Sequence, residues 1–159
     1  MKTTIIFLTL ALAISTQTFA QTDGNGEIKR NGIYAEFYGI RHAFSSGLVS
    51  INYERNFFKD GKTALRIGVY PDFKTTFSFP ITFTWIAWPL KKHHLEYGAG
   101  AVFRLEFYEG NIYKDMPAVM IPIMYRYQNN KGLFFRAGVN VWISWPSLVS
   151  PSLSLGYKF

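Results

Sequence analysis

The stretch PSLSLGYKF, Pro151–Phe159, decides the fold. Large apolar residues at Leu153, Leu155, Tyr157 and Phe159 alternate there with small or polar residues. A strict period of two places successive side chains on opposite sides of a β-strand. The stretch therefore predicts a strand with one apolar face and one polar face, and the rest of the chain can be compared with this pattern.

The composition describes a single domain in which apolar and polar residues are finely mixed. The chain has 159 residues, of which 48% are hydrophobic and 18% aromatic, yet the mean hydropathy is only +0.03. Outside the N-terminus, no apolar run is long enough for a membrane-spanning helix. The absence of cysteine excludes disulfides, thiolate metal sites and a lipidated cysteine. Despite the net charge of +7, no nucleic-acid partner is expected, because the basic residues alternate with aromatic ones instead of forming a stripe.

Residues 1–20 have the pattern of a secretory signal peptide. Lys2 supplies the positive charge, Ile5–Ile14 the apolar core, and Ala20 the small residue expected just before the cleavage site. A transmembrane anchor is the alternative, but this apolar run is too short and lacks a stop-transfer flank. We therefore expect cleavage between Ala20 and Gln21.

The remaining sequence divides into a polar tail, residues 21–31, and a region of regular alternation, residues 32–159. Eight segments alternate in this region: Gly32–Arg41, Gly47–Asn56, Thr63–Pro71, Phe77–Trp88, His94–Phe107, Pro117–Gln128, Gly132–Ser144 and Val149–Phe159. A tilted β-strand needs about 9–11 residues to cross a membrane. The even count predicts an all-β fold, an eight-stranded antiparallel up-and-down transmembrane barrel whose narrow interior is filled by side chains.

The breaks between the segments fall into two sets. Tight turns with Asp-Gly or Asn-rich chemistry follow the second, fourth and sixth segments, at Lys59–Lys62, Pro89–His93 and Asn129–Lys131. The other set consists of His42–Ser46, Asp72–Thr76, Tyr108–Met116 and Trp145–Leu148. If both termini face the periplasm, the first set forms periplasmic turns and the second forms external loops, of which only Tyr108–Met116 is long.

The two parities of these segments carry different side chains. One parity is bulky and apolar, as in Phe77, Phe79 and Ile81. The opposite parity holds the charged residues predicted to form an interior network: Glu36, Glu54, Arg66, Glu96, Arg104, Glu106, Arg126, Arg136 and Lys158. It also holds the glycines Gly68, Gly98, Gly100, Gly138 and Gly156. We expect the charges to pair with one another, since buried charges persist only when they are paired.

Two architectures produce this alternation. A secreted, soluble, lipocalin-like binding barrel places the apolar face inside, whereas an outer-membrane barrel places it toward lipid and the charges inside. The glycines favour the membrane barrel, because they make room in a narrow interior and would only weaken a solvent-exposed face. Aromatic residues expected to form interfacial girdles near the segment ends also favour it, namely Tyr53, Trp85, Tyr127, Trp142, Trp145 and Tyr157.

Together, the signal peptide, the alternation, the asymmetric turns and the terminal aromatic residue resemble small Gram-negative outer-membrane barrels of the OmpA/OmpX-like, porin-family-like kind. The resemblance covers the whole chain after the signal peptide. It implies that the barrel-assembly machinery reads the alternate residues of the last strand, Leu153, Leu155, Tyr157 and Phe159. The sequence departs from the family pattern in its short loops and in Pro80 and Pro122. Each proline removes a donor from a ladder, so we expect each at a bulge or a local break.

These patterns indicate a location and an architecture more directly than a molecular task. We expect a monomeric, non-enzymatic outer-membrane protein of structural or interaction type, with a plugged lumen, outer-membrane lipids around it and no cofactor. The alternative from another class is a lipid-modifying barrel enzyme, such as a lipid A deacylase or acyltransferase.

The candidate catalytic residues for this enzyme are His42, Ser45 and Ser46. Nucleophilic hydrolysis needs a carboxylate that orients the histidine, and the sequence does not place one beside these residues. His93 and His94 are expected in a solvated turn and not in a metal site, which would need further ligands.

Overall fold

The computed structural model describes residues 29–39, 49–58, 61–71, 76–89, 92–108, 111–114, 116–143 and 148–159. The expected signal peptide, with its cleavage site at Ala20 and Gln21, lies outside these ranges. The same holds for residues 21–28 of the polar tail, for Trp145, and for the candidate catalytic residues His42, Ser45 and Ser46. In the ranges described, no helix is both long enough and apolar enough to cross a membrane.

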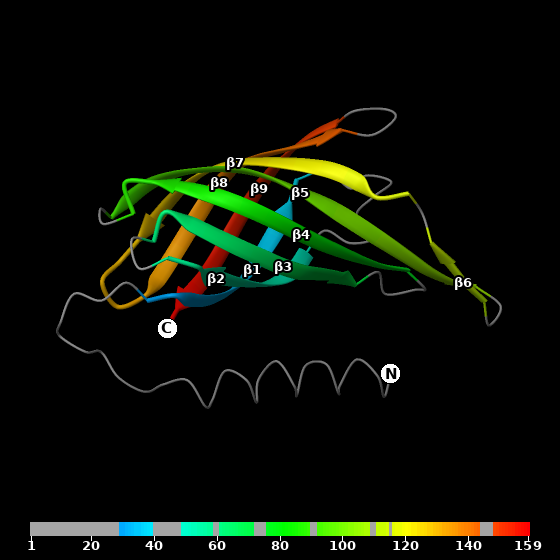
Figure 1. Cartoon of the computed structure of the whole chain (residues 1–159), viewed down its shortest axis with the longest axis horizontal. Coiled ribbons are helices and arrows are strands. Elements are labelled where there is room, and N and C mark those ends of the chain that lie inside the picture. The colour runs from blue at the N-terminus through cyan, green and yellow to red at the C-terminus, as the bar shows by residue number, and fades with distance from the viewer. Residues whose placement is uncertain are drawn as a thin grey trace.

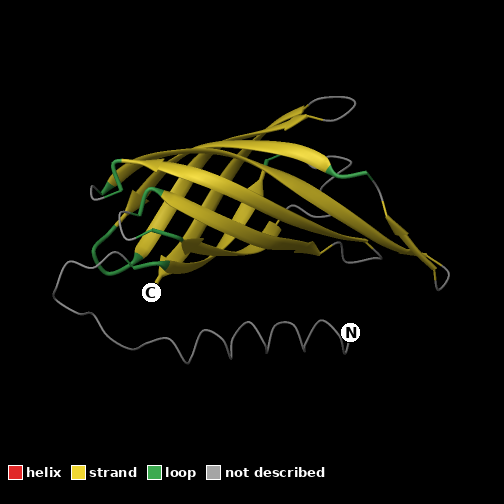
Figure 2. Cartoon of the chain, viewed as in Figure 1, coloured by secondary structure: helices red, strands yellow, loops and turns green. Residues whose placement is uncertain are grey.

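The described residues form nine strands in one antiparallel sheet that closes on itself (Figures 1 and 2). The strands are β1 (Asn31–Tyr38), β2 (Val49–Asn56), β3 (Thr63–Pro71), β4 (Thr76–Ala87), β5 (His93–Tyr108), β6 (Asn111–Lys114), β7 (Ala118–Gln128), β8 (Leu133–Ile143) and β9 (Leu148–Lys158). Because β1 pairs with β9 and β4 with β5, eight of them make a closed ring, and the short β6 pairs with the end of β5 outside it. The predicted eight-stranded up-and-down barrel is confirmed.

The outer face of the barrel is apolar, whereas most inward positions carry polar or charged side chains. In β2, for example, Ile51 is 43% exposed whereas the next residue, Asn52, is 4% exposed. Among the outward positions of the eight ring strands, Arg55 and His93 are the residues with basic or acidic side chains, and both lie at the barrel end that holds Asn31 and Phe159. The middle of the outer face therefore carries an apolar belt without charges.

The segment expected to form the long loop Tyr108–Met116 contains a strand. β5 has 16 residues, and its last four, Leu105 to Tyr108, pair with β6. Figure 1 shows this hairpin extending beyond the ring. The sequence 108–116 breaks the period of two, which is why alternation did not predict a strand there. Main-chain pairing with an already extended β5 accounts for the strand instead.

The expected interfacial position of Trp142 is wrong. This side chain is fully buried inside the barrel, in an apolar cluster with Tyr70 and Met120. Trp142 lies opposite Met120 in the register of β7 and β8, and so it has the inward parity of its strand. Trp85 and Tyr127, which have the outward parity, are 46% and 40% exposed as expected. Proximity to a strand end therefore does not determine the direction of an aromatic side chain, whereas parity does.

Glycines allow the strands to curve tightly on the inner face. At Gly98, Gly100 and Gly138, an added Cβ would collide with a main-chain oxygen of the neighbouring strand. At Gly156, it would collide with the side chain of Tyr34. A barrel of eight strands has a small radius, and strong coiling of its strands requires such positions without side chains.

Pro80 and Pro122 interrupt the ladder without a bulge. The pairing of β3 with β4 has a gap where Pro80 faces Gly68, and the pairing of β5 with β7 has a gap where Pro122 faces Gly98. The register is the same on both sides of each gap, so neither strand contains an inserted residue. The expected local break is therefore confirmed, and its cause is the missing N–H of proline.

We predict that Gly100→Ala destabilises the barrel by about 1–3 kcal/mol, because the new methyl group would overlap the main chain of β4. The matched control is Ala101→Val, which enlarges the next, outward-facing side chain and is expected to change the stability by less than about 0.5 kcal/mol. Urea unfolding of the detergent-folded protein measures both variants. Equal stabilities would show that the close approach at Gly100 relaxes freely.

Candidate functional site

Seven charged side chains meet inside the barrel, one from each ring strand except β4. They form what we call the interior charge cluster: Glu36 (β1), Glu54 (β2), Arg66 (β3), Glu96 (β5), Arg126 (β7), Arg136 (β8) and Lys158 (β9). Each of them is at most 6% exposed. All seven occupy inward positions, and the register places Glu54 directly opposite Arg66 and Arg126 directly opposite Arg136.

Glu54 is the centre of the cluster. Its carboxylate accepts hydrogen bonds from Arg66 Nε at 2.9 Å and from Arg126 Nη2 at 2.7 Å. Lys158 Nζ lies 2.9 Å from the second carboxylate oxygen. Three cations from three other strands thus surround one carboxylate that is fully buried. This is the arrangement in which buried charges are tolerated, because each ion replaces its lost water with charged partners.

Glu96 forms a second centre that shares cations with the first. Arg126 Nε lies 2.8 Å from one of its oxygens and Arg136 Nη1 lies 3.5 Å from the other. Arg66 also donates to this carboxylate. Because Arg66 and Arg126 contact both Glu54 and Glu96, the two carboxylates belong to one continuous network.

Aromatic rings cover the arginine side chains of the cluster. The Arg136 guanidinium lies 3.9 Å from the ring centre of Tyr34, and the Arg126 guanidinium lies 4.3 Å from that of Phe134. The two rings meet edge to face at 5.8 Å. Desolvated cation–π contacts of this kind contribute on the order of 2 kcal/mol. The rings therefore stabilise the cations and also fill the space beside them.

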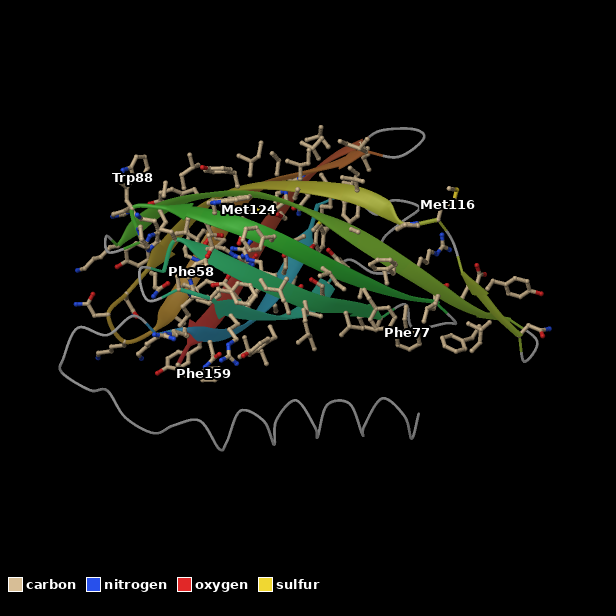
Figure 3. The ribbon with its side chains drawn as sticks, viewed as in Figure 1. Phe58, Phe77, Trp88, Met116, Met124 and Phe159 are labelled. Atoms are coloured by element: carbon tan, nitrogen blue, oxygen red, sulfur yellow. The ribbon has the colours of Figure 1, made fainter. Side chains whose placement is uncertain are left out.

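Toward the other end of the barrel, the interior becomes apolar. Tyr38, Tyr70, Val102, Ala118, Met120 and Trp142 form one buried cluster there. The hydroxyl groups of Tyr38 and Tyr70 are hydrogen-bonded to each other. Between the two zones lies a cavity of about 10 Å³. Figure 3 shows the side chains along the barrel, with Trp88 at one end, Met116 at the opposite end and Met124 between them.

Two of the nine predicted network residues do not belong to the cluster. Arg104 and Glu106 lie near the β6 end of β5, where their side chains are 26% and 41% exposed. They form an ion pair with each other at 3.8 Å. Their inward parity was predicted correctly from the sequence, but the alternation does not show how far along the barrel axis a residue lies.

Several buried polar residues in or near the cluster were not predicted from the sequence. Asn56 accepts a hydrogen bond from Lys158 Nζ at 2.5 Å, and Asn140 donates one to Glu36 at 3.2 Å. His94, expected in a solvated turn, is 4% exposed, and its Nδ1 lies 3.0 Å from the Trp88 carbonyl oxygen. The inward parity of all three residues was visible in the sequence, but the identity of their partners depends on the strand register.

The cluster consists of ion pairs and hydrogen bonds. In the described part of the chain, no three His, Cys, Asp or Glu side chains come close enough to hold a metal ion. The arrangement can hold strands together and can occupy the space inside the barrel, and these are its direct chemical capabilities.

Comparison with known proteins supports the fold and goes no further. No family model matches the sequence, and no curated protein matches it. Among solved structures, the N-terminal β-barrel domain of Pseudomonas aeruginosa OprF is similar, with a TM-score of 0.57 and 14% sequence identity. The alignment covers 82% of this chain and 98% of that domain. At this identity the likeness establishes a shared eight-stranded barrel fold alone.

We predict that Glu54→Gln destabilises the barrel by about 3–5 kcal/mol, because it leaves buried cations without their shared counter-ion. The matched control is Glu106→Gln, which removes a carboxylate that is 41% exposed and should cost at most about 1 kcal/mol. Denaturant unfolding of both variants in micelles measures the difference. If both substitutions have the same small effect, the interior charge cluster does not stabilise the fold.

Proposed function

We propose that the protein is an integral outer-membrane β-barrel of structural or interaction type, without catalytic activity, whose own side chains fill its interior. The observation that carries the proposal is the inverted polarity of the closed barrel. Its outer face is an apolar belt without charges, and its inner face holds the interior charge cluster. This is the polarity of transmembrane barrels, in which lipid-facing and interior side chains alternate along each strand.

The rival proposal, a soluble lipocalin-like barrel, does not suit the outer face. Ile51, Phe135 and Leu155 are 43%, 42% and 54% exposed, and they belong to a belt of similar side chains around the ring. Contact with water costs roughly 25 cal/mol for each Å² of apolar surface. Soluble monomers rarely expose apolar patches larger than a few hundred Å². Lipid removes this cost and thereby favours the membrane barrel.

We further propose that both termini face the periplasm. Residue Asn31 at the start of β1 and Phe159 after β9 are hydrogen-bonded through their main chains, so they share one end of the barrel. The β5–β6 hairpin extends the opposite end, which would then face the outside (Figure 1). Residues 1–20, removed before Gln21, would direct export to this location.

The proposal of a plugged lumen is supported by the small size of the central cavity and by the buried ion pairs around it. The cavity between the charged and apolar zones has about 10 Å³, which is close to the minimum for one water molecule. The carboxylates of the cluster are ion-paired with neighbouring cations on both sides of the barrel axis. A hydrated ion would have to displace several of these pairs to pass.

To test the membrane proposal, we predict that Ile123→Lys, in the middle of the apolar belt, destabilises the barrel in lipid vesicles by about 2–4 kcal/mol. The matched control is Tyr127→Lys on the same face of β7, four residues closer to the strand end, where the cost should be about 0–1 kcal/mol. Heat-modifiable gel migration during denaturant titration reports the folded fraction. A soluble barrel would tolerate lysine equally well at both positions.

To test the plugged lumen, we predict that the folded barrel shows no stable conductance in a planar bilayer. The reason is that eight strands enclose too little space once the buried side chains are in place. A large porin reconstituted in the same bilayer serves as the control. Stable channel openings comparable to those of the porin would refute the filled interior and leave the membrane proposal intact.

A further inference from the structure

A broad groove crosses the outer face of the barrel over β1. Its volume is about 300 Å³. The side chains that line it project outward from β1, β2, β8 and β9, and they are Ile33, Ala35, Ile51, Leu133, Leu155 and Tyr157. All are apolar or aromatic, and the groove is shallow and widely open to the surroundings of the barrel.

The groove exists because its floor carries little side-chain volume. Ala35 lies directly between Ile51 of β2 and Leu155 of β9 in the strand register, so a methyl group is flanked by two much larger side chains. Beside it, Gly156 contributes only main chain to the lining. Its inner face lies against Tyr34, which leaves no room there for a side chain. The depression is therefore fixed by the packing inside the barrel and does not depend on a mobile loop.

One end of the groove is surrounded by basic residues, which we call the basic mouth: Lys29, Arg30, Arg55 and Lys131. Lys29 Nζ lies 5.1 Å from the ring centre of Tyr157 and donates a hydrogen bond to the main-chain oxygen of Lys131 at 2.7 Å. On the other side of β1, Arg55 of β2 pairs with Asn31, the first residue of β1. Arg30 directly precedes Asn31 in the chain. The cations thus lie on both sides of the point where the groove reaches the barrel end.

The basic mouth differs from the interior charge cluster in its partners. Within the described ranges, Lys29, Arg30, Arg55 and Lys131 form no ion pair with a carboxylate, whereas every cation of the interior cluster does. Arg30, Arg55 and Lys131 are exposed. Their charges are therefore available to an anion at the barrel end, beside an apolar groove that runs toward the middle of the belt.

We propose that this groove binds one anionic phospholipid. An acyl chain lies over Ala35 between Ile51 and Leu155, and the phosphate group lies at the basic mouth. The inference rests on the proposed function, because it requires the outer face to contact a bilayer and the terminal end to lie in the periplasmic leaflet. Such a lipid is complementary to the site in both of its parts. Its acyl chain matches the apolar groove, and its phosphate group matches the cations of the basic mouth.

The expected contributions of the two parts can be separated. Each lysine or arginine near an anionic lipid surface increases binding by about fivefold, so charge should control the choice between headgroups. Burial of methylene groups in the groove is independent of the headgroup. A larger side chain at Ala35, in the floor of the groove, should therefore weaken the binding of every diacyl lipid. Loss of cations from the basic mouth should instead reduce only the preference for anionic headgroups.

The experiment uses the full processed chain, folded in detergent micelles and titrated with dioleoyl phosphatidylglycerol or dioleoyl phosphatidylcholine, with native mass spectrometry as the readout. We expect one phosphatidylglycerol per barrel, retained at least about tenfold better than phosphatidylcholine. Ala35→Phe, which fills the groove, should reduce the retention of both lipids by about tenfold or more. The matched control Ala101→Phe enlarges an outward alanine on β5 and should leave retention unchanged.

The double variant Lys29→Gln/Lys131→Gln removes two of the four cations and should reduce the preference for phosphatidylglycerol by about tenfold or more. Its control, Lys92→Gln at another turn of the same end, should keep the preference unchanged. Equal retention of the two lipids by the unmodified protein, or unchanged retention by Ala35→Phe, would overturn the proposal. So would a dimer that Ala35→Phe dissociates, since the groove would then hold a second copy of the chain. Heat-modifiable migration is measured on the same samples. Failure to fold in micelles contradicts the proposed function, whereas a folded barrel without lipid preference contradicts the lipid site alone.

Discussion

The pairing of buried charges inside a narrow closed ring is the constraint on which the rest of the structure depends. Removing an ion from water costs several kcal/mol even after the protein relaxes. The fold meets this cost by placing Glu54 and Glu96 between cations from β3, β7, β8 and β9. Seven of the eight ring strands place a charged side chain inward and apolar side chains outward. The outer belt and the interior charge cluster are therefore two consequences of one alternation.

Along the barrel axis, the interior changes from charged to apolar side chains. This change accounts for the positions of the aromatic rings and of the two prolines. The interior charge cluster occupies the half near Asn31 and Phe159, and the aromatic cluster around Trp142 occupies the other half. Tyr34 and Phe134 lie against the guanidinium groups of Arg136 and Arg126. The gaps in the ladder at Pro80 and Pro122 lie between the two halves, where both prolines line the small central cavity.

Much of the fold could be predicted from the sequence, because a period of two reports directly on which face a side chain occupies. The expected boundaries of β3, Thr63–Pro71, agree with the structure, and the inward direction of Arg66 and Arg136 followed from parity. Depth along the barrel and choice of partner depend on register, which alternation does not encode. For this reason Arg104 and Glu106 were assigned to the wrong zone, and the hydrogen bond that Lys158 donates to Asn56 was missed. The β5–β6 hairpin was missed because pairing with a neighbour, and not its own sequence pattern, makes β6 a strand.

The wide sequence separation of the cluster's partners has a consequence for the order of folding. Arg126 and Glu54 are 72 residues apart, and Lys158 and Asn56 are 102 apart. Contacts between residues so far apart in the sequence cannot form until most of the chain between them has been arranged. Proteins dominated by such contacts fold slowly. A partly assembled sheet without β9 would hold Glu54 without Lys158 and would lack the seam with β1. Closure of the ring between β1 and β9 therefore also brings the last cation to Glu54, which stabilises the closed barrel relative to a half-built one.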